Sequence, residues 1–168
     1  MREYALPQEL RGKWIWLGRD EARLESYVFF RRDMTLYETP TSAELWITAR
    51  TCFHLFVNGR YIALGPPPCP TEHAYVVYLN VGFLLETGRN SIAVLAHNTS
   101  VSRFGSRRQP SGLWLQLNLN GSPAVWTDES WFCREADCYL PNQPRLDQAG
   151  GFVECVDLGR FPDGWCER

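Results

Sequence analysis

The chain has 168 residues, of which 45% are apolar and 14% aromatic, and this composition supports one domain with one hydrophobic core. Its net charge of −2 and isoelectric point of about 5.9 provide no positive field, so we expect neither a nucleic-acid partner nor an anionic-membrane partner. No run of about 18 or more apolar residues occurs, and residues 1–7 lack the apolar centre of a signal peptide. We therefore expect a soluble chain, either cytoplasmic or exported.

Residues 1–25 form a polar lead, partly helical near its end, which we expect to pack on the domain. The first predicted strand is 26–32, because aromatic and β-branched side chains favour a pleated surface. Residues 41–49 alternate in polarity, which predicts a second strand. Its expected core face consists of Leu45, Ile47 and Ala49.

The strongest turn signal is Asn58-Gly59, which lies between two strand-like runs at 53–57 and 60–64. Both turn residues tolerate positive φ, which a two-residue type I′ turn requires, so this stretch predicts a tight antiparallel hairpin. The proline-rich run 65–70 cannot continue a central strand, because proline lacks an amide donor. We expect a rigid surface loop there.

The clearest alternation is at 113–120, where four leucines share one face while Trp114 and three polar residues share the other. This pattern predicts a half-buried antiparallel strand, followed by a second hairpin turn at Asn120-Gly121. Weaker patterns predict four further elements. They are a strand at 74–79, a helical turn at 81–86, a strand at 90–96 and a strand at 130–136.

Short strands separated by turn residues, with no long amphipathic helix, predict an all-β fold, an antiparallel jelly-roll β-sandwich. No linker is long enough to divide the chain, so we expect residues 26–168 to form a single sandwich domain that follows the lead at 1–25. The loop-like chemistry of residues 161–168 indicates a fragment of a larger modular enzyme.

The chemically reactive residues show no spacing typical of a catalytic or metal centre. The six cysteines include no C-x-x-C pair, and the three histidines are scattered among them, so structural thiols are expected, with a disulfide or a zinc site as less supported alternatives. No motif for a nucleophile, a P-loop or a metallohydrolase occurs, and the carboxylates are expected to be solvated surface groups. We therefore predict no catalytic residue, no metal ligand and no cofactor in this chain.

The longest polar connection between predicted strands, residues 97–110, is the candidate binding segment, because long loops in compact domains often carry function. Asn98 offers a donor and an acceptor, Arg103 a forked donor, and Phe104 a flat apolar face, which together suit a polyhydroxylated ligand. Trp114 could stack on a sugar ring or pack under a loop. The alternatives for the segment are a mobile solvated loop and, with less support, a nucleic-acid contact.

Six segments that carry a family pattern occur in order between residues 26 and 165. They are 43–49, the hairpin Val57-Asn58-Gly59 with Gly65-Pro66, 88–94, 111–117, Thr127-Asp128-Glu129-Ser130-Trp131, and 152–157. Together they resemble the N-terminal β-sandwich of bacterial α-L-rhamnosidases, glycoside hydrolase family 78. The hairpin and the run Gly-x-Asn-x-Ile also resemble the sugar-binding domains of β-galactosidase-like enzymes, which share the galactose-binding-like jelly roll.

The resemblance implies a parent enzyme that removes terminal rhamnose by an inverting mechanism, with its catalytic acids in an (α/α)6 barrel that this chain lacks. It implies a non-catalytic accessory domain whose partner is that barrel and whose ligand is a rhamnose-containing carbohydrate. It also implies that a loop beginning at His97 and Asn98 lies at the cleft rim. Together with the residues chosen for their side-chain chemistry, the candidate binding or rim residues are His97, Asn98, Arg103, Phe104 and Trp114. The alternatives are an autonomous carbohydrate-binding module, the sugar-binding domain of a β-galactosidase-like glycosidase, and a stand-alone adhesion sandwich.

Overall fold

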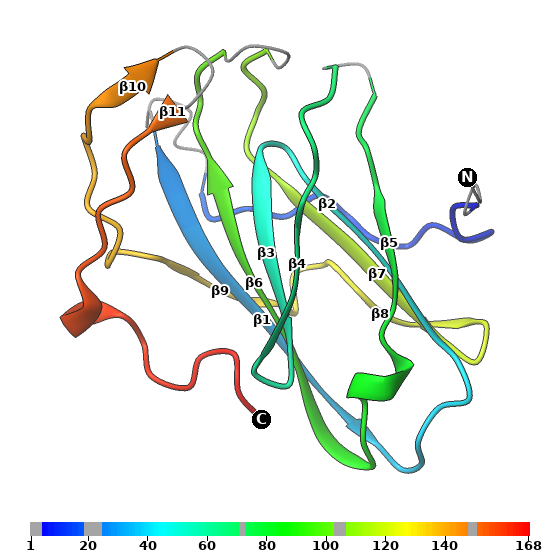
Figure 1. The fold of residues 1–168 in the computed structure, drawn as a ribbon. Coiled ribbons are helices and arrows are strands. Elements are labelled where there is room, and N and C mark those ends of the chain that lie inside the picture. Colours follow the sequence, from blue (N-terminus) through cyan, green and yellow to red (C-terminus); the bar gives the residue numbers. More distant parts are fainter. Residues whose placement is uncertain (1–4, 19–24, 71–72, 103–106, 148–150) are drawn as a thin grey trace.

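The computed structural model describes residues 5–18, 25–70, 73–102, 107–147 and 151–168. Strands account for 46% of the structure and helix for 4%, which confirms the all-β prediction. Two antiparallel sheets pack face to face as a β-sandwich (Figure 1). In the described part of the chain, no helix has the length and apolar character needed to cross a membrane.

The elements in chain order are β1 (Ser26–Leu36), β2 (Ala43–Ala49), β3 (Cys52–Val57), β4 (Arg60–Gly65), β5 (Val77–Asn80), the 3-10 turn η1 (Gly82–Leu84), β6 (Gly88–Asn98), β7 (Leu113–Leu119), β8 (Ser122–Trp126), β9 (Phe132–Glu135), β10 (Arg145–Asp147), β11 (Gly151–Phe152) and the 3-10 turn η2 (Leu158–Arg160). One sheet has the order β4-β3-β6-β1-β9, and the other has the order β5-β2-β7-β8. β10 pairs only with β11 among the described strands. The long central pairs, β1 with β6 and β2 with β7, therefore join segments that are far apart in sequence.

The hydrophobic core lies between the inner faces of the two sheets. Because side chains alternate along a strand, every second residue points inward, and burial of such side chains contributes about 25 cal/mol per Å² of apolar surface. The inward faces that were predicted for β2 and β7 are confirmed. Side chains with no exposed surface in this layer include Phe30, Leu45, Ile47, Phe53, Leu55, Val57, Ile92, Val94, Leu113, Leu115 and Leu117.

Both predicted hairpin turns are confirmed by backbone angles. Asn58 and Gly59 have φ of 51° and 78°, and Asn120 and Gly121 have φ of 51° and 80°, as a two-residue turn with two positive φ values requires. Asn58 is also a local anchor, because its Oδ1 accepts a 2.8 Å hydrogen bond from the Ser91 amide of β6. The turn between β3 and β4 is therefore attached to the neighbouring strand.

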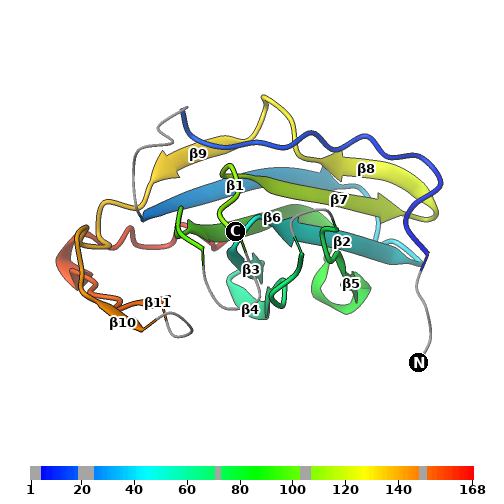
Figure 2. The same ribbon diagram turned by 90° about the horizontal axis from the view of Figure 1, so that it is seen from above.

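The outer face of the four-stranded sheet is covered by residues 5–18, which run along one side of the sandwich (Figure 2). Side chains on this face donate to carbonyl oxygens of that segment: Trp46 Nε1 to Ala5 (3.2 Å), Gln116 Nε2 to Glu9 (2.8 Å) and Trp114 Nε1 to Gly12 (2.8 Å). Gln116 is 0% exposed and Trp114 8% exposed, so β7 is buried on both faces. The prediction of a half-buried strand is wrong here, because alternating polarity shows which face turns away from the main core and not what covers that face.

Part of the outer face of the five-stranded sheet is covered by residues 136–147 and 151–168, on the opposite side of the sandwich (Figures 1 and 2). Phe29 of β1 contacts the rings of Phe161 and Trp165, with ring centroids 5.5 Å and 4.5 Å away. Tyr139 stacks on Tyr27 at 4.0 Å. The pair β10 and β11 lies in this segment and was not predicted, because strands of three and two residues are too short for a period-two pattern.

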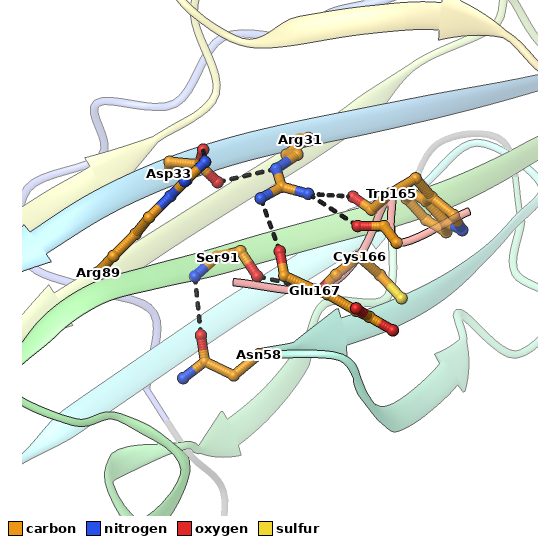
Figure 3. A network of polar contacts seen from close by, with 9 residues as sticks. Arg31, Asp33, Asn58, Arg89, Ser91, Trp165, Cys166 and Glu167 are labelled. Atoms are coloured by element: carbon orange, nitrogen blue, oxygen red, sulfur yellow. Dashed lines mark hydrogen bonds and ion pairs between the residues drawn. The ribbon is translucent and has the colours of Figure 1, made fainter. Parts of the chain in front are cut away.

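Arg31 on β1 holds the last turn of the chain (Figure 3). Its Nη1 donates to the carbonyl oxygens of Gly164 (3.2 Å) and Trp165 (2.6 Å), and its Nη2 donates to that of Glu167 (2.6 Å). Its Nε donates to Asp33 Oδ1 at 2.8 Å, which fixes the plane of the guanidinium. One cation thus binds the carbonyl groups of three residues in a single turn.

Two further groups complete this attachment. The carbonyl oxygen of Cys166 accepts hydrogen bonds from Ser91 Oγ (3.0 Å) and from the Gly59 amide (2.8 Å). Burial raises the pKa of Asp33, but hydrogen bonds from Arg89 and Arg31 outweigh burial and leave that pKa below its usual value. Asp33 therefore stays ionised and keeps its pair with Arg31 at neutral pH.

The variant Arg31→Met removes the donors for three carbonyl groups while it retains much of the apolar stem. We expect a loss of about 1–3 kcal/mol in the free energy of unfolding, and faster hydrogen exchange at the Glu167 amide, which bonds to Gly164 O at 3.0 Å. Arg134→Met is the matched control, because Arg134 is exposed and pairs only at the surface with Asp137, so its loss should cost no more than about 0.5 kcal/mol. Equal exchange at the Glu167 amide in the two variants would contradict the assignment.

Candidate functional site

A cavity of about 370 Å³ lies at the end of the sandwich where β6 ends and β7 begins, the upper end in Figure 1. The described residues that line it are the last residue of β6 and residues of the connection from β6 to β7. They are Asn98, Ser100, Arg108, Gln109, Pro110 and Ser111. None of these described lining residues is acidic, and one is a cation. The cavity therefore coincides with the segment that the sequence singled out at 97–110.

Asn98 ties the two ends of this connection together. Its Oδ1 accepts from Thr51 Oγ1 (2.8 Å), and its Nδ2 donates to Ser100 Oγ (3.0 Å) and Ser111 Oγ (2.5 Å). The side chain is only 2% exposed. Asn98 was predicted to contact a ligand, but in the structure both of its amide atoms bind the chain itself, so its established contacts position the cavity wall.

Gln109 is the second buried amide of the cavity wall, with 7% of its surface exposed. Its Oε1 accepts from Arg50 Nη1 at 3.3 Å, while its Nε2 is buried and has no hydrogen-bond partner among the residues that the structure describes. Only the oxygen of an amide can accept from a guanidinium, so this contact assigns the orientation of the amide group. The buried donor that is left over costs free energy unless a further group accepts from it.

Arg50 supports Gln109 from behind the cavity. Its guanidinium lies 3.9 Å from the ring centroid of Trp14, and among the described residues no carboxylate lies within ion-pair distance of it. Burial lowers the pKa of Arg50 from its usual value, but an arginine remains charged at neutral pH. The wall therefore has a cation next to Gln109 that forms no ion pair with a described carboxylate.

The other residues predicted for the site do not join Asn98. His97 is the neighbour of Asn98 on β6 and so points to the opposite face, where its ring stacks on Tyr27 at 3.9 Å. Trp114 lies beneath residues 5–18, which fits the alternative that it packs under another segment and leaves no open ring face for a sugar. Arg103 and Phe104 lie outside the described residues.

Sequence analysis did not identify Gln109, Ser100, Ser111 or Arg50. The sequence contained only a weak indication of them: small hydroxyl residues lie close to the ends of two predicted strands, where they can bind a buried amide. Ser100 also has φ of 50°, a conformation that few residues other than glycine adopt. A single sequence does not show that these positions meet.

A second cavity, of about 280 Å³, contains the adjacent carboxylates Asp128 and Glu129 beside Lys13. Hydrogen bonds from Ser130 hold the pKa of Asp128 below its usual value. A backbone hydrogen bond and the 3.0 Å ion pair with Lys13 lower the pKa of Glu129. A glycosidase needs one carboxyl group with a raised pKa as its general acid, and neither of these groups meets that requirement.

Titratable side chains also cluster where His97 meets the C-terminal segment. His97 Nε2 lies 3.4 Å from Glu25 Oε1, and Tyr27 Oη donates to Glu154 Oε1 at 3.3 Å. Burial, with the charges of Glu154 and Glu25, raises the pKa of Tyr27. Burial raises the pKa of Tyr139 to about 12, so both phenols stay protonated at neutral pH.

The described residues contain no group of three or more His, Cys, Asp or Glu side chains that could hold a metal ion. None of the six cysteines, all of which are described, forms a disulfide. Burial raises the pKa of Cys138 and that of Cys166, so both thiols remain protonated at neutral pH.

Asn98→Ala should destabilise the fold, because it leaves the hydroxyl groups of Thr51, Ser100 and Ser111 without their shared partner. We expect a loss of about 2–3 kcal/mol in the free energy of unfolding, measured by urea denaturation. Gln143→Ala, which truncates a partly exposed amide that donates to the nearby Pro141 O, is the control and should change stability by less than about 0.5 kcal/mol. An effect of Asn98→Ala no larger than that of the control would contradict the role of Asn98.

The stability of the chain should fall on mild acidification because of His54. Burial lowers the pKa of His54, the charge of Glu154 offsets part of this effect, and the charge of His97 adds to it. The unfolded chain therefore binds more protons than the folded chain as pH falls through about 6.5, which favours unfolding. Urea denaturation at about pH 8 and about pH 5 should show a smaller pH-dependent loss for His54→Gln than for the unmodified chain.

The matched control for this experiment is His73→Gln, because His73 is exposed. We expect it to retain the pH dependence of the unmodified chain. If His54→Gln lost as much stability between the two pH values as His73→Gln does, His54 would not be the responsible group.

No protein-family model matches the chain, and no curated protein matches it. Among solved structures, the chain matches the GH78 family rhamnosidase of Bacillus sp. GL1 with a TM-score of 0.87 and 29% identity, over 93% of this chain and 17% of that enzyme. It also matches the α-L-rhamnosidase from Dictyoglumus thermophilum, with a TM-score of 0.65 and 20% identity, over 84% of this chain and 16% of that enzyme. The lectin from Pleurotus ostreatus in complex with GalNAc matches with a TM-score of 0.53 and 20% identity, over 86% of this chain and 42% of the lectin.

The matches at 20% identity show the fold alone, and the lectin fits the galactose-binding-like sandwich that was predicted. The Bacillus match extends over nearly all of this chain but only a small part of the enzyme. The resemblance to family 78 is therefore confirmed in this form: the chain is similar, over 93% of its length, to a β-sandwich portion of a GH78 rhamnosidase.

Proposed function

We propose that the chain is a non-catalytic accessory domain of an α-L-rhamnosidase-like glycoside hydrolase and that it supports a separate (α/α)6 catalytic domain. The observation that carries this proposal is the unequal coverage of the Bacillus match, 93% of this chain and 17% of the enzyme. A domain that supports a separate catalytic domain needs a rigid structure more than it needs a reactive site. The continuous core and the segments that pack on both outer faces of the sandwich supply that rigidity.

The chemistry of the described side chains supports the same assignment. The cavity between β6 and β7 has no carboxylate among its described lining residues, and the cavity beside Lys13 has two carboxylates whose pKa values are both lowered. Inverting and retaining glycosidases alike need one protonated and one ionised carboxyl group on either side of the bond that is cleaved. The catalytic pair is therefore expected on the partner domain.

A second candidate is a carbohydrate-binding role for the chain itself, at the cavity between β6 and β7. It is favoured by a wall of buried amide and hydroxyl groups, which suits a polyhydroxylated ligand. The fold shared with a lectin is compatible with this role. Such binding could place a rhamnose-containing chain near the catalytic cleft of the parent enzyme.

The accessory role predicts that the purified chain releases no phenol from an aryl α-L-rhamnoside, whereas the complete parent enzyme does. Deletion of residues 1–168 from the parent should lower the melting temperature of the remaining catalytic domain, because the deletion exposes the surface on which the sandwich packs. Measurable turnover by the chain alone would contradict the proposal. So would a stop codon directly after Arg168.

A further inference from the structure

Several of the described side chains that line the cavity between β6 and β7 have a hydrogen-bond donor to offer. Gln109 Nε2 is a buried donor without a partner, and its orientation is set by the contact of Oε1 with Arg50. Ser100 Oγ and Ser111 Oγ each accept from Asn98 Nδ2, so each hydroxyl still has its own hydrogen to donate. A ligand that offers hydrogen-bond acceptors therefore matches these side chains better than a ligand that offers donors.

The charged side chains at the cavity also favour a ligand that carries acceptor atoms. Arg108 is in the lining and Arg50 lies behind Gln109, while no acidic side chain occurs among the described lining residues. Arg50 is held against Trp14 and has no ion pair with any described carboxylate. The described lining therefore contains a cation and no acid, although the whole chain has a net charge of −2.

The ligand classes differ in how they meet this requirement. A neutral sugar offers hydroxyl groups that donate as well as accept, whereas a carboxylate accepts only, at two oxygens with about four lone-pair sites. A volume of about 370 Å³ is within the range of small-molecule sites, about 300–1,000 Å³, and admits one sugar residue. A sugar acid therefore complements both the donors and the charge.

We propose that this cavity binds a carboxylate-bearing sugar, a uronic acid residue, whose carboxylate accepts from Gln109 Nε2 and lies against the positive charge of Arg108. The inference rests on the carbohydrate-binding candidate for the same cavity, and it adds the chemical class of the ligand. Its carboxylate would give the buried amide of Gln109 the acceptor that it lacks in the chain.

Isothermal titration calorimetry on the chain with methyl β-D-glucuronide and methyl β-D-glucoside tests this directly, because the two probes differ only at C6. The corresponding galacturonide and galactoside form a second matched pair. We expect saturable binding of at least one uronide with a Kd of about 1 mM or tighter, and at least about tenfold weaker binding of its neutral counterpart. The side-chain amide signal of Gln109 in a ¹H–¹⁵N spectrum should shift on addition of that uronide.

Gln109→Glu replaces the unpaired donor by an acceptor of the same size and keeps the contact with Arg50. It should weaken uronide binding by at least about tenfold. Gln143→Glu introduces the same charge at a partly exposed position that does not line the cavity, and it should leave the Kd unchanged. If Gln109→Glu fails to fold, as judged by thermal unfolding, Arg108→Gln provides the test and should weaken uronide binding by at least about fivefold.

Three outcomes would overturn the inference. Equal binding of the uronide and its neutral counterpart would leave a carbohydrate site without selectivity for acids. Uronide binding that both Gln109→Glu and Arg108→Gln leave intact would place the ligand elsewhere on the chain. The absence of saturable binding by all four glycosides up to about 20 mM would remove the carbohydrate-binding candidate as well, while the accessory role would still be judged by the activity of the parent enzyme.

Discussion

The architecture depends on side-chain donors that reach from the outer faces of both sheets to the carbonyl groups of the two terminal segments. Most of residues 5–18 and 161–168 lie outside any strand, so most of their backbone polar groups have no ladder partner and must be satisfied in another way. Trp46, Trp114 and Gln116 supply donors on one side, and Arg31 supplies them on the other. Because these contacts hold the segments in place, the central strands β6 and β7 are buried on both faces along most of their length.

The sequence predicted what depends on local pattern and missed what depends on distant pairing. Leucines at every second position of β7 and the Asn-Gly turns act over a few residues, and both appear in the structure as predicted. The burial of Gln116 depends on a carbonyl group 107 residues away, so no local pattern contains it. His97 and Asn98 were grouped as neighbours in a loop, although the period-two geometry of β6 sends them to opposite faces.

The candidate site was likewise predicted in its location but not in its contacts. The predicted segment does contain a cavity, but the amide that the sequence emphasised, Asn98, is engaged by hydroxyl groups of the chain, while the unpartnered donor is on Gln109. Asn98 gives the wall its shape, and Gln109 with the two arginines gives it a chemical preference. The two acids of the cavity beside Lys13, Asp128 and Glu129, have lowered pKa values, so neither of them is suited to act as a general acid.

The attachment of the last turn also determines how this end of the chain responds to a pulling force. The guanidinium of Arg31 donates to the carbonyl groups of Gly164, Trp165 and Glu167, and the hydroxyl of Ser91 donates to that of Cys166. Because one guanidinium and one hydroxyl make all of these contacts, the residues of the turn are expected to detach together and not one at a time. Tension applied at Arg168 would therefore act on β1 and β6. Both strands are hydrogen-bonded to a neighbour on each side, so the force would act on the interior of the sheet and not on an edge strand.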